Sequence, residues 1–368
     1  MLGFLNDGIC PQEKKEFQAL AIFLVKNKLP SALTWLLVQT GAETLELDNC
    51  ELGQEALRVI AGWAKSLPFQ FRLDLSGNCI DAAGAALLAD ALGANTITHL
   101  DLGNNALQDQ GVQALCAGLG QNTSLRSLVL HHCSMTNPGV QALADVVDAH
   151  APLTALVLDG NAFDEHGAAI FAAALGRSRT LSSLSLRVSR LSDAGMACIA
   201  RALISNTGLR SLALSGQDEE CEHLPNALAD ALAANQTLAT LVVYAGPMAD
   251  PAARRRAAGM ALNSTLRDFE LWVNPYGRTK ENEAVMRQIS DKVQANALIA
   301  QAGLALSELS QMPESGVPVP AEIGDRIAAF TAQVAGDERR SKALKSIGEA
   351  GPLRAARPDT ASESKNRA

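Results

Sequence analysis

Three stretches of the chain share one pattern and decide the fold: ITHLDLGNN (Ile97–Asn105), LRSLVLHHC (Leu125–Cys133) and LTALVLDGN (Leu153–Asn161). Each has apolar residues at its first, fourth and sixth positions and ends in asparagine or cysteine. Weaker copies begin at Ala42, Gln70, Leu181, Leu209, Leu238 and Leu266. The nine copies start 27 to 29 residues apart, and a fixed period of this length indicates a stack of structural repeats.

The second half of each repeat predicts a helix. Apolar residues follow a glycine at spacings of three and four, as in GAALLADALGAN from Gly84 and GVQALCAGLGQN from Gly111. One column of the predicted helices consists of Leu88, Leu115, Leu143, Phe171 and Ile199. A strand followed by a helix cannot bury its apolar face alone, so successive repeats must stack. The sequence therefore predicts an α/β solenoid.

The repeats resemble those of the leucine-rich repeat superfamily, in particular its long-repeat class, which is similar to ribonuclease inhibitor. The resemblance runs from about Ala42 to Tyr276. It implies a horseshoe with a parallel sheet on the concave face and helices outside. It also implies that the motif asparagine bonds to backbone groups of the turn. In four repeats that position holds an asparagine: Asn78, Asn105, Asn161 and Asn274. In two repeats it holds a cysteine, Cys50 or Cys133. The other three repeats depart from the pattern with Ser189, Gln217 and Gly246.

Composition divides the chain into four segments. We expect a helical cap over residues 1–41, with Phe17, Leu20, Phe23 and Leu24 facing inward. About nine repeats fill residues 42–278, and a capping helix follows over residues 279–311. Residues 312–368 read as a linker, a short helix and a disordered basic tail, because from Glu338 onward eight Lys or Arg stand against four Glu or Asp.

Charge, hydropathy and cysteine content indicate which partners and which cellular compartment to expect. The 368 residues carry a net charge of −8, which disfavours nucleic acid because phosphate binding requires clustered basic residues. The apolar stretch Ala19–Val25 is far shorter than the ~20 residues of a membrane helix. Seven scattered cysteines without a CxxC motif indicate reduced thiols. We therefore expect a cytoplasmic protein with neither a nucleic-acid nor a membrane partner.

Catalytic motifs are missing from the sequence. It contains no GxSxG, HExxH or glycine-rich phosphate loop. The run HHC (His131–Cys133) invites a zinc hypothesis, but neighbouring residues on a strand point to opposite faces, so they cannot share one metal ion. We therefore predict no enzyme, no metal and no cofactor.

The residues between the motif leucines predict a binding surface on the concave face. Its members are Glu46, Asp48, Asp74, Asp101, His131, His132, Asp159, Arg187, Tyr244, Glu270 and Trp272. The acidic residues of the early repeats are either simply solvated or steer a basic partner. Trp272 either anchors an interface, as aromatic residues often do, or packs under the terminal helix.

These observations favour a non-enzymatic scaffold that acts as a monomer and binds a partner protein. The alanine-rich repeats resemble those of GALA-type bacterial type III effectors, which implies a virulence protein secreted into the host-cell cytoplasm. KLPSALTWLL (Lys28–Leu37) is only a fragment of the F-box found in that group. Two alternatives remain open: a GTPase-activating protein of the Ran activator type, with Arg187 as its catalytic arginine, and a ubiquitin-ligase adaptor.

Overall fold

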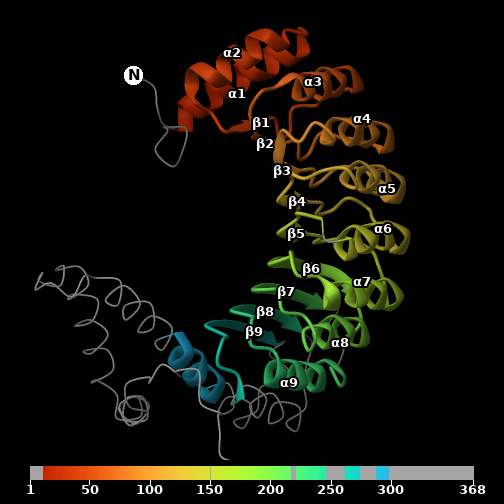
Figure 1. The fold of residues 1–368 in the computed structure, drawn as a ribbon, viewed down its shortest axis with the longest axis vertical. Coiled ribbons are helices and arrows are strands. Elements are labelled where there is room, and N and C mark those ends of the chain that lie inside the picture. The colour runs from red at the N-terminus through yellow and green to blue at the C-terminus, as the bar shows by residue number, and fades with distance from the viewer. Residues whose placement is uncertain (1–10, 150, 217–220, 246–261, 274–286, 298–368) are drawn as a thin grey trace, which may run out of the picture. The chain divides into compact units, whose positions relative to one another are not determined.

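Nine parallel strands form one sheet in the computed structural model, which describes residues 11–149, 151–216, 221–245, 262–273 and 287–297 (Figure 1). The strands follow one another in chain order from β1 to β9, without a crossover. Their bounds are β1 Thr44–Glu46, β2 Phe71–Asp74, β3 Ile97–Asp101, β4 Ser127–Val129, β5 Ala155–Val157, β6 Ser183–Leu191, β7 Ser211–Gly216, β8 Thr240–Ala245 and β9 Asp268–Val273.

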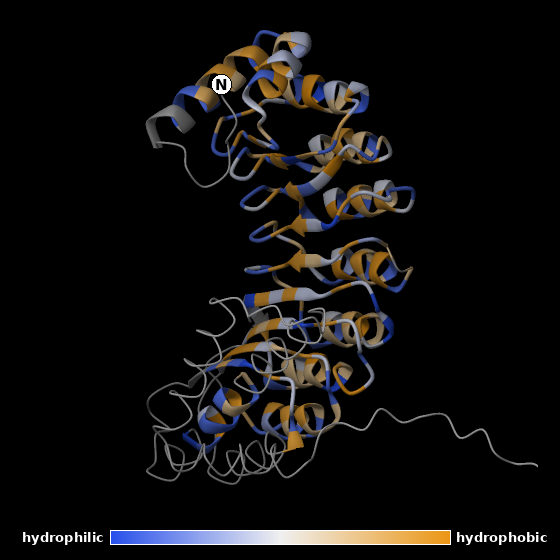
Figure 2. Ribbon diagram, turned by 60° about the vertical axis from the view of Figure 1, so that its left-hand side comes forward, coloured by the Kyte–Doolittle hydropathy of each residue, from blue (hydrophilic) through white to orange (hydrophobic). Residues whose placement is uncertain are grey.

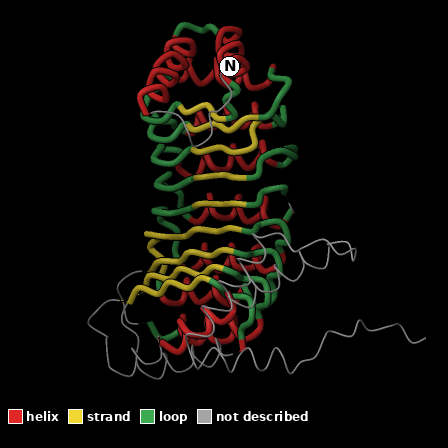
Figure 3. Tube along the Cα trace, turned by 90° about the vertical axis from the view of Figure 1, so that its left-hand side faces the viewer, coloured by secondary structure: helices red, strands yellow, loops and turns green. Residues whose placement is uncertain are grey.

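One helix follows each of the strands β1 to β7, and it packs on the helices of the neighbouring repeats. All seven helices lie on the same side of the sheet (Figures 1 and 3). They are α3 Gln54–Ser66, α4 Ala82–Leu92, α5 Gln108–Leu119, α6 Asn137–Asp148, α7 Glu165–Arg177, α8 Asp193–Ala202 and α9 Leu224–Ala234. This arrangement is the predicted α/β solenoid, with an open sheet on one side and helices on the other.

The chain divides into two compact units, residues 1–293 and 294–368. The sheet and helices α1 to α9 belong to the first unit. Residues 287–297 are helical, and Ile289 and Val293 are buried there. The rest of the predicted terminal helix, the linker and the basic tail lie outside the described residues.

The core runs between the sheet and the helices as one continuous layer. The motif leucines of the strands are buried, as Leu128, Leu156 and Leu184 show in three successive repeats. The helix column predicted from the sequence is also buried at every position from Leu88 to Ile199. Because each repeat contributes the same apolar positions, neighbouring repeats bury one another's surface and no repeat is stable alone.

The motif asparagines bond to the backbone as the resemblance implied. Asn105 Nδ2 donates to the carbonyls of Leu75 at 3.0 Å and of Leu102 at 2.9 Å, and Asn105 Oδ1 accepts from the backbone N–H groups of Asn78 and Ile80, each at 2.9 Å. Asn78 and Asn161 make the same bonds one repeat earlier and two repeats later. These amides therefore tie each turn to the one before it.

A second set of buried asparagines ties the helix ends together, and the sequence analysis did not identify it. Asn206 Nδ2 donates to the carbonyl of Leu175 at 2.6 Å and of Ser178 at 3.0 Å, while Asn206 Oδ1 accepts from the N–H of Leu209 at 2.8 Å. The equivalent residues are Asn122, Asn235 and Asn263. Each stands three residues before the first leucine of a repeat, which is the signal that could have revealed the set.

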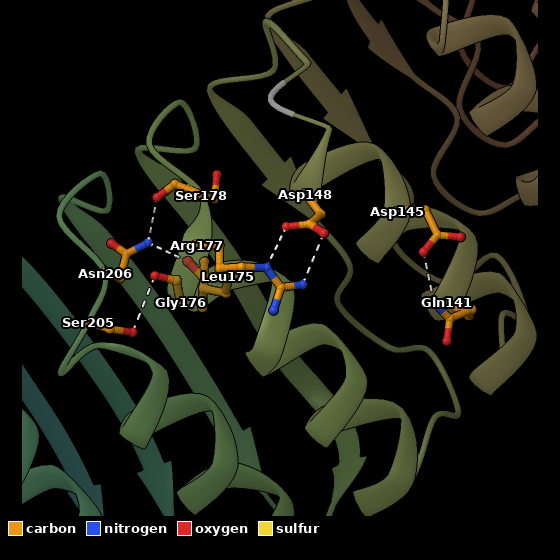
Figure 4. A network of polar contacts seen from close by, with 9 residues as sticks. All are labelled: Gln141, Asp145, Asp148, Leu175, Gly176, Arg177, Ser178, Ser205 and Asn206. Atoms are coloured by element: carbon orange, nitrogen blue, oxygen red, sulfur yellow. Dashed lines mark hydrogen bonds and ion pairs between the residues drawn. The ribbon is translucent and has the colours of Figure 1, made fainter.

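Polar contacts on the helix side also join neighbouring repeats (Figure 4). Arg177 at the end of α7 binds Asp148 at the end of α6 through two contacts, Nε–Oδ1 at 2.6 Å and Nη2–Oδ2 at 3.0 Å. Ser205 Oγ donates to the carbonyl of Gly176 at 3.2 Å. Exposed ion pairs contribute little to stability, so we assign the main inter-repeat energy to the buried asparagines and the apolar core.

The repeat that departs from the asparagine motif has a longer strand. Strands β1 to β5 end at or before the motif position and span three to five residues, whereas β6 runs over nine residues to Leu191. Ser189 stands at the motif position of β6. The Ser189 hydroxyl donates to the carbonyl of Arg187 at 3.4 Å, and the strand continues through this position.

The N-terminal segment contains two helices, α1 (Pro11–Lys26) and α2 (Pro30–Thr40), and its inward face differs from the prediction. Leu24 is buried and Phe17 half-buried as expected, but Leu20 and Phe23 are exposed. The buried face of α1 is formed by Ala21, Leu24 and Val25 instead. Helix α1 has apolar residues among both its buried and its exposed positions, and hydrophobic colour recurs along its length in Figure 2. Spacing alone therefore did not indicate which side packs on the core.

Four of the described cysteines, Cys50, Cys116, Cys133 and Cys221, are buried. Burial raises the pKa of the Cys116 and Cys133 thiols to about 12. A thiol with such a pKa stays protonated near neutral pH and behaves as a small apolar group. Cys116 is therefore a packing residue of the core.

Candidate functional site

The candidate site is the face of the sheet that points away from helices α3 to α9, which we call the sheet face (Figure 3). Side chains alternate along a strand, so the residues between the motif leucines point away from the core. The strand register aligns them in columns across the repeats. The central column consists of Glu46, Asp74, Asp101, Val129, Val157, Ser185, Ala213, Val242 and Glu270.

Four carboxyl groups gather at the β1–β3 end of the sheet face: Glu46, Asp48, Asp74 and Asp101. The register places Glu46 beside Asp74 and Asp74 beside Asp101. Asp74 Oδ1 accepts from the N–H of Ser76 at 2.9 Å and from Ser76 Oγ at 2.8 Å. Neighbouring parallel strands lie about 4.8 Å apart, so these carboxylates form one concentrated negative surface.

Helix α1 also contributes to this acidic end. Gln18 Nε2 donates to Asp48 Oδ1 at 2.9 Å, across 30 residues of sequence. The contact fixes the orientation of one carboxylate and brings the N-terminal helices to the edge of the sheet face. Nothing in the repeat pattern predicts it, because Gln18 lies outside the repeats.

Asp101 has the least favourable environment of the four carboxyl groups. Its pKa is raised above the ordinary 3.8, mainly by burial and further by the charges of Asp74 and Asp48. The N–H of Gly103, which donates to Asp101 Oδ1 at 2.8 Å, and the nearby His131 act in the opposite direction. The ionised carboxylate therefore costs stability at neutral pH.

Asp101→Asn is expected to raise the thermal unfolding midpoint at pH 7. The folded pKa lies above the unfolded value, so the folded state binds more protons between the two, and stability falls as pH rises through that window. Asparagine keeps the bond from the N–H of Gly103 but carries no charge. Thermal unfolding followed by circular dichroism should show the gain at pH 7 and lose it near about pH 2, where the Asp101 carboxyl is protonated in both the folded and the unfolded state.

The matched control for this change is Asp230→Asn on the exposed side of α9. It removes the same charge from a position away from the sheet face and should leave the unfolding midpoint almost unchanged at both pH values. A midpoint of the Asp101→Asn protein below that of the wild type at pH 7 would show that the carboxylate stabilises the fold.

Two histidines follow β4 and lie beside the acidic end. His131 Nε2 lies 2.9 Å from Asn104 Nδ2, and the rings of His131 and His132 meet edge to face with centroids 5.9 Å apart. His132 has a positive φ of 51° and is exposed, so it belongs to the turn rather than to the strand. The described residues contain no group of three or more His, Cys, Asp or Glu placed to hold a metal ion.

A glycine in the preceding repeat makes room for His131. A Cβ atom on Gly103 would lie 1.9 Å from Cε1 of the His131 ring. The ring therefore lies directly over the backbone of the neighbouring strand end, and its imidazole is held by this packing as well as by Asn104.

The middle of the sheet face holds an aromatic contact between two predicted site residues. The Arg187 guanidinium carbon lies 5.9 Å from the centroid of the Tyr244 ring, in cation–π range. Arg187 belongs to β6 and Tyr244 to β8, so the contact spans β7, whose Ser215 the register pairs with Tyr244. Asp159 Oδ1 accepts from the backbone N–H of Arg187 at 2.8 Å.

Small side chains surround this contact on β6 and β7. The sheet-face positions of these strands are Ser183, Ser185, Ser211, Ala213 and Ser215. Ser185 Oγ donates to Asp159 Oδ1 at 2.7 Å. Strands β6 and β7 thus carry only small side chains at these positions, between the histidines after β4 and Tyr244 of β8.

The last two predicted site residues lie on β9. The register pairs Glu270 with Val242 and Trp272 with Tyr244, and Glu270 is exposed. The structure thus gathers eight of the eleven predicted residues into three groups: the acidic end, the histidine pair and the Arg187–Tyr244 contact. Asp159 adjoins the third group through the backbone N–H of Arg187, and Glu270 and Trp272 lie on β9 outside the three groups. Whether Trp272 packs under the terminal helix falls outside the side chains that the structure describes.

Known proteins resemble parts of this chain. A family model described as "Leucine Rich repeat" matches residues 72–89, 93–116 and 121–144. Human "NACHT, LRR and PYD domains-containing protein 13" is 43% identical over 65 residues, which are 17% of this chain and only 6% of that protein. The chain therefore matches a small fraction of that relative.

The solved structures that resemble parts of this chain have low sequence identity and TM-scores below 0.5. TLR13 in its complex with ssRNA13 is 18% identical, over 62% of this chain and 32% of that one, with a TM-score of 0.35. The leucine-rich repeat-containing protein LegL7 from Legionella pneumophila is 19% identical, over 68% and 81% of the two chains, with a TM-score of 0.42.

Proposed function

Because the chain is a leucine-rich repeat protein, we propose that it is a non-enzymatic scaffold that binds a partner protein on the sheet face. Leucine-rich repeat proteins generally mediate protein–protein interaction. The observation that supports this site is the three groups of polar and aromatic side chains on a face that α3 to α9 leave uncovered. These side chains have no part in the core between sheet and helices.

The chemistry of the sheet face indicates what the partner presents. The carboxylates of β1 to β3 favour a basic segment, because complementary charge accelerates association and selects the partner. The small residues of β6 and β7 leave room for an apolar side chain beside Tyr244, and aromatic residues often dominate binding energy. We therefore propose a partner with a basic segment and an apolar anchor, placed in that order from β1 to β8.

We place the partner in a host cell, because the alanine-rich repeats resemble those of type III effectors. Among the described residues, no helix is both long and apolar enough to cross a membrane. The GTPase-activating alternative requires the Arg187 guanidinium to reach a nucleotide on the partner. Its position over the Tyr244 ring supports a contact role for this arginine instead.

Site-specific photo-cross-linking tests the proposed surface. A photoreactive amino acid replaces Ser211 on the sheet face or, as a control, Arg201 on the exposed side of α8. Eukaryotic and bacterial lysates are then irradiated with each protein. A partner cross-linked from the eukaryotic lysate at position 211 and not at position 201 is the expected result. Cross-linking at position 201 alone would place the interface on the helices.

The captured partner then allows the acidic end to be tested. The double variant Asp74→Asn, Asp101→Asn keeps the side-chain shapes and removes two charges, so we expect at least about tenfold weaker binding and a weaker dependence on salt. Asp230→Asn on α9 is the control and should bind as the wild type does. Unchanged affinity in the double variant would mean that the carboxylates are simply solvated.

A further inference from the structure

The outward faces of α1 and α2 hold most of the exposed large apolar side chains in the described part of the chain. Leu20 and Phe23 on α1 are 44% and 57% exposed, and Trp35 and Val38 on α2 are 63% and 57% exposed. Leu29, in the turn between the helices, is 44% exposed. Beyond these helices, the comparable described residues are Ile204 and Leu262. The terminal units of solenoids normally carry a polar outer face. We therefore expect the apolar surface at this end to be covered in the functional protein.

The exposed side chains lie on the sides of α1 and α2 that face away from the core. Helices α1 and α2 pack against each other, and both contact α3. Leu20 and Phe23 are three residues apart, as are Trp35 and Val38, so each pair lies along one face of its helix. The core-facing residues, among them Leu33, Leu36 and Leu37 of α2, occupy the opposite faces. The two helices thus form a layer with a buried inner side and an apolar outer side.

We propose that this outer side, which we call the cap face, is the contact surface of a homodimer. Five large side chains at these exposures amount to roughly 500 Å² of apolar surface per copy. Two copies together reach about 1,000 Å², and with a polar rim they enter the range of specific interfaces. Two helices from each copy would form a four-helix arrangement, which is a common way to bury such faces.

The sequence of α1 fits pairing with a second copy of itself. Glu16, Leu20, Phe23 and Asn27 recur at helical spacing and form one stripe, polar at both ends and apolar in the middle. This order is the same when it is read backwards. An antiparallel pair of α1 helices, related by a two-fold axis between positions 20 and 23, therefore places Leu20 of one copy against Phe23 of the other. Isologous interfaces require this self-complementarity.

The homodimer goes beyond the proposed function and does not depend on it, because the cap face and the sheet face use different residues. It replaces the expectation of a monomer. The dimer would present two sheet faces, so a partner with two binding segments would be held more tightly than by one copy alone.

Sedimentation velocity of the full chain tests the homodimer. Over about 1–100 µM, a range chosen for a micromolar equilibrium, we expect the mass to rise to twice the 38.6 kDa of one chain. In the double variant Phe23→Glu, Trp35→Ser, the midpoint of the monomer–dimer transition should shift at least tenfold to higher protein concentration. Ile204→Glu, an equally apolar exposed position outside the cap face, should not. Circular dichroism spectra and unfolding midpoints must match those of the wild type.

A mixing experiment tests the antiparallel geometry. Leu20→Lys and Phe23→Glu should each weaken the dimer, and an equimolar mixture should regain it, because position 20 faces position 23 across the two-fold axis. A wild-type chain that stays at 38.6 kDa throughout overturns the proposal. If that monomer floats with phosphatidylglycerol vesicles and Phe23→Glu does not, the cap face binds lipid instead.

Discussion

Asn161→Leu is expected to lower the free energy of unfolding by about 3–5 kcal/mol. The Asn161 side chain is buried and makes four short bonds. Its Oδ1 accepts from the N–H groups of Cys133 and Met135, each at 3.1 Å, and its Nδ2 donates to the carbonyls of Leu130 at 2.7 Å and Leu158 at 2.9 Å. Leucine is of similar size but leaves these backbone groups buried without a partner, at about 1–3 kcal/mol for each unsatisfied group.

The chain supplies its own control for this prediction. Cys50 and Cys133 occupy the same motif position, and their thiols bond to carbonyls, with Sγ of Cys50 3.0 Å from the carbonyl of Asp48 and Sγ of Cys133 3.2 Å from that of Leu102. Asn161→Cys should therefore lose clearly less stability than Asn161→Leu. Urea unfolding followed by circular dichroism measures both. Equal losses, or a loss below about 1 kcal/mol for leucine, would show that the amide bonds are not what holds the turns.

The repeat period predicted the fold because the same strand and helix positions recur in nine repeats. The apolar columns of strand and helix, the parallel register and the asparagine turns all follow from residues that recur 27 to 29 positions apart. A single repeat would not have distinguished a short strand from a turn, since β4 and β5 span only three residues each. Repetition removes this ambiguity, because a pattern shared by neighbours must pack on itself.

The N-terminal helices lack this redundancy, and there the prediction was partly wrong. The spacing of Phe17, Leu20, Phe23 and Leu24 fits a helix, but it does not identify which side faces the core. Ala21 and Val25 complete the buried side in the structure, and Leu20 and Phe23 are left exposed. A small residue such as Ala21 carries little weight in a hydrophobic pattern, although it permits the close approach that selects this side.

The sequence also indicated which residues share the sheet face, but not how they contact one another. The strand register follows from the period, so the acidic end could be located in advance. Gln18 contacts Asp48, and Arg187 contacts Tyr244. Each contact depends on side-chain conformations and on the residues that lie between its two partners. These contacts cannot be read from a repeat pattern, because they occur only once.

The second large effect on stability is expected where helix α5 contacts helix α4 closely. Gly118 lies in α5, where a Cβ atom would be 2.4 Å from the carbonyl oxygen and 2.9 Å from the carbonyl carbon of Ala89 in α4. The obstacle is backbone, which cannot rotate away as a side chain can. Helices α4 and α5 are thus in contact through bare backbone at this point, and the separation of two whole repeats depends on the absence of one methyl group.

Gly118→Ala is therefore expected to destabilise the protein by about 2–3 kcal/mol, although alanine is the better helix former. Gly62 in α3 is the matched control, because a Cβ atom there would meet nothing within 4 Å. Gly62→Ala should stabilise the protein by roughly 0.5–1 kcal/mol through helix propensity alone. The two substitutions are chemically identical, so opposite signs in urea unfolding isolate the packing of neighbouring repeats. Stabilisation by both would mean that α4 and α5 can move apart at little cost and that the repeat spacing is set by the strands.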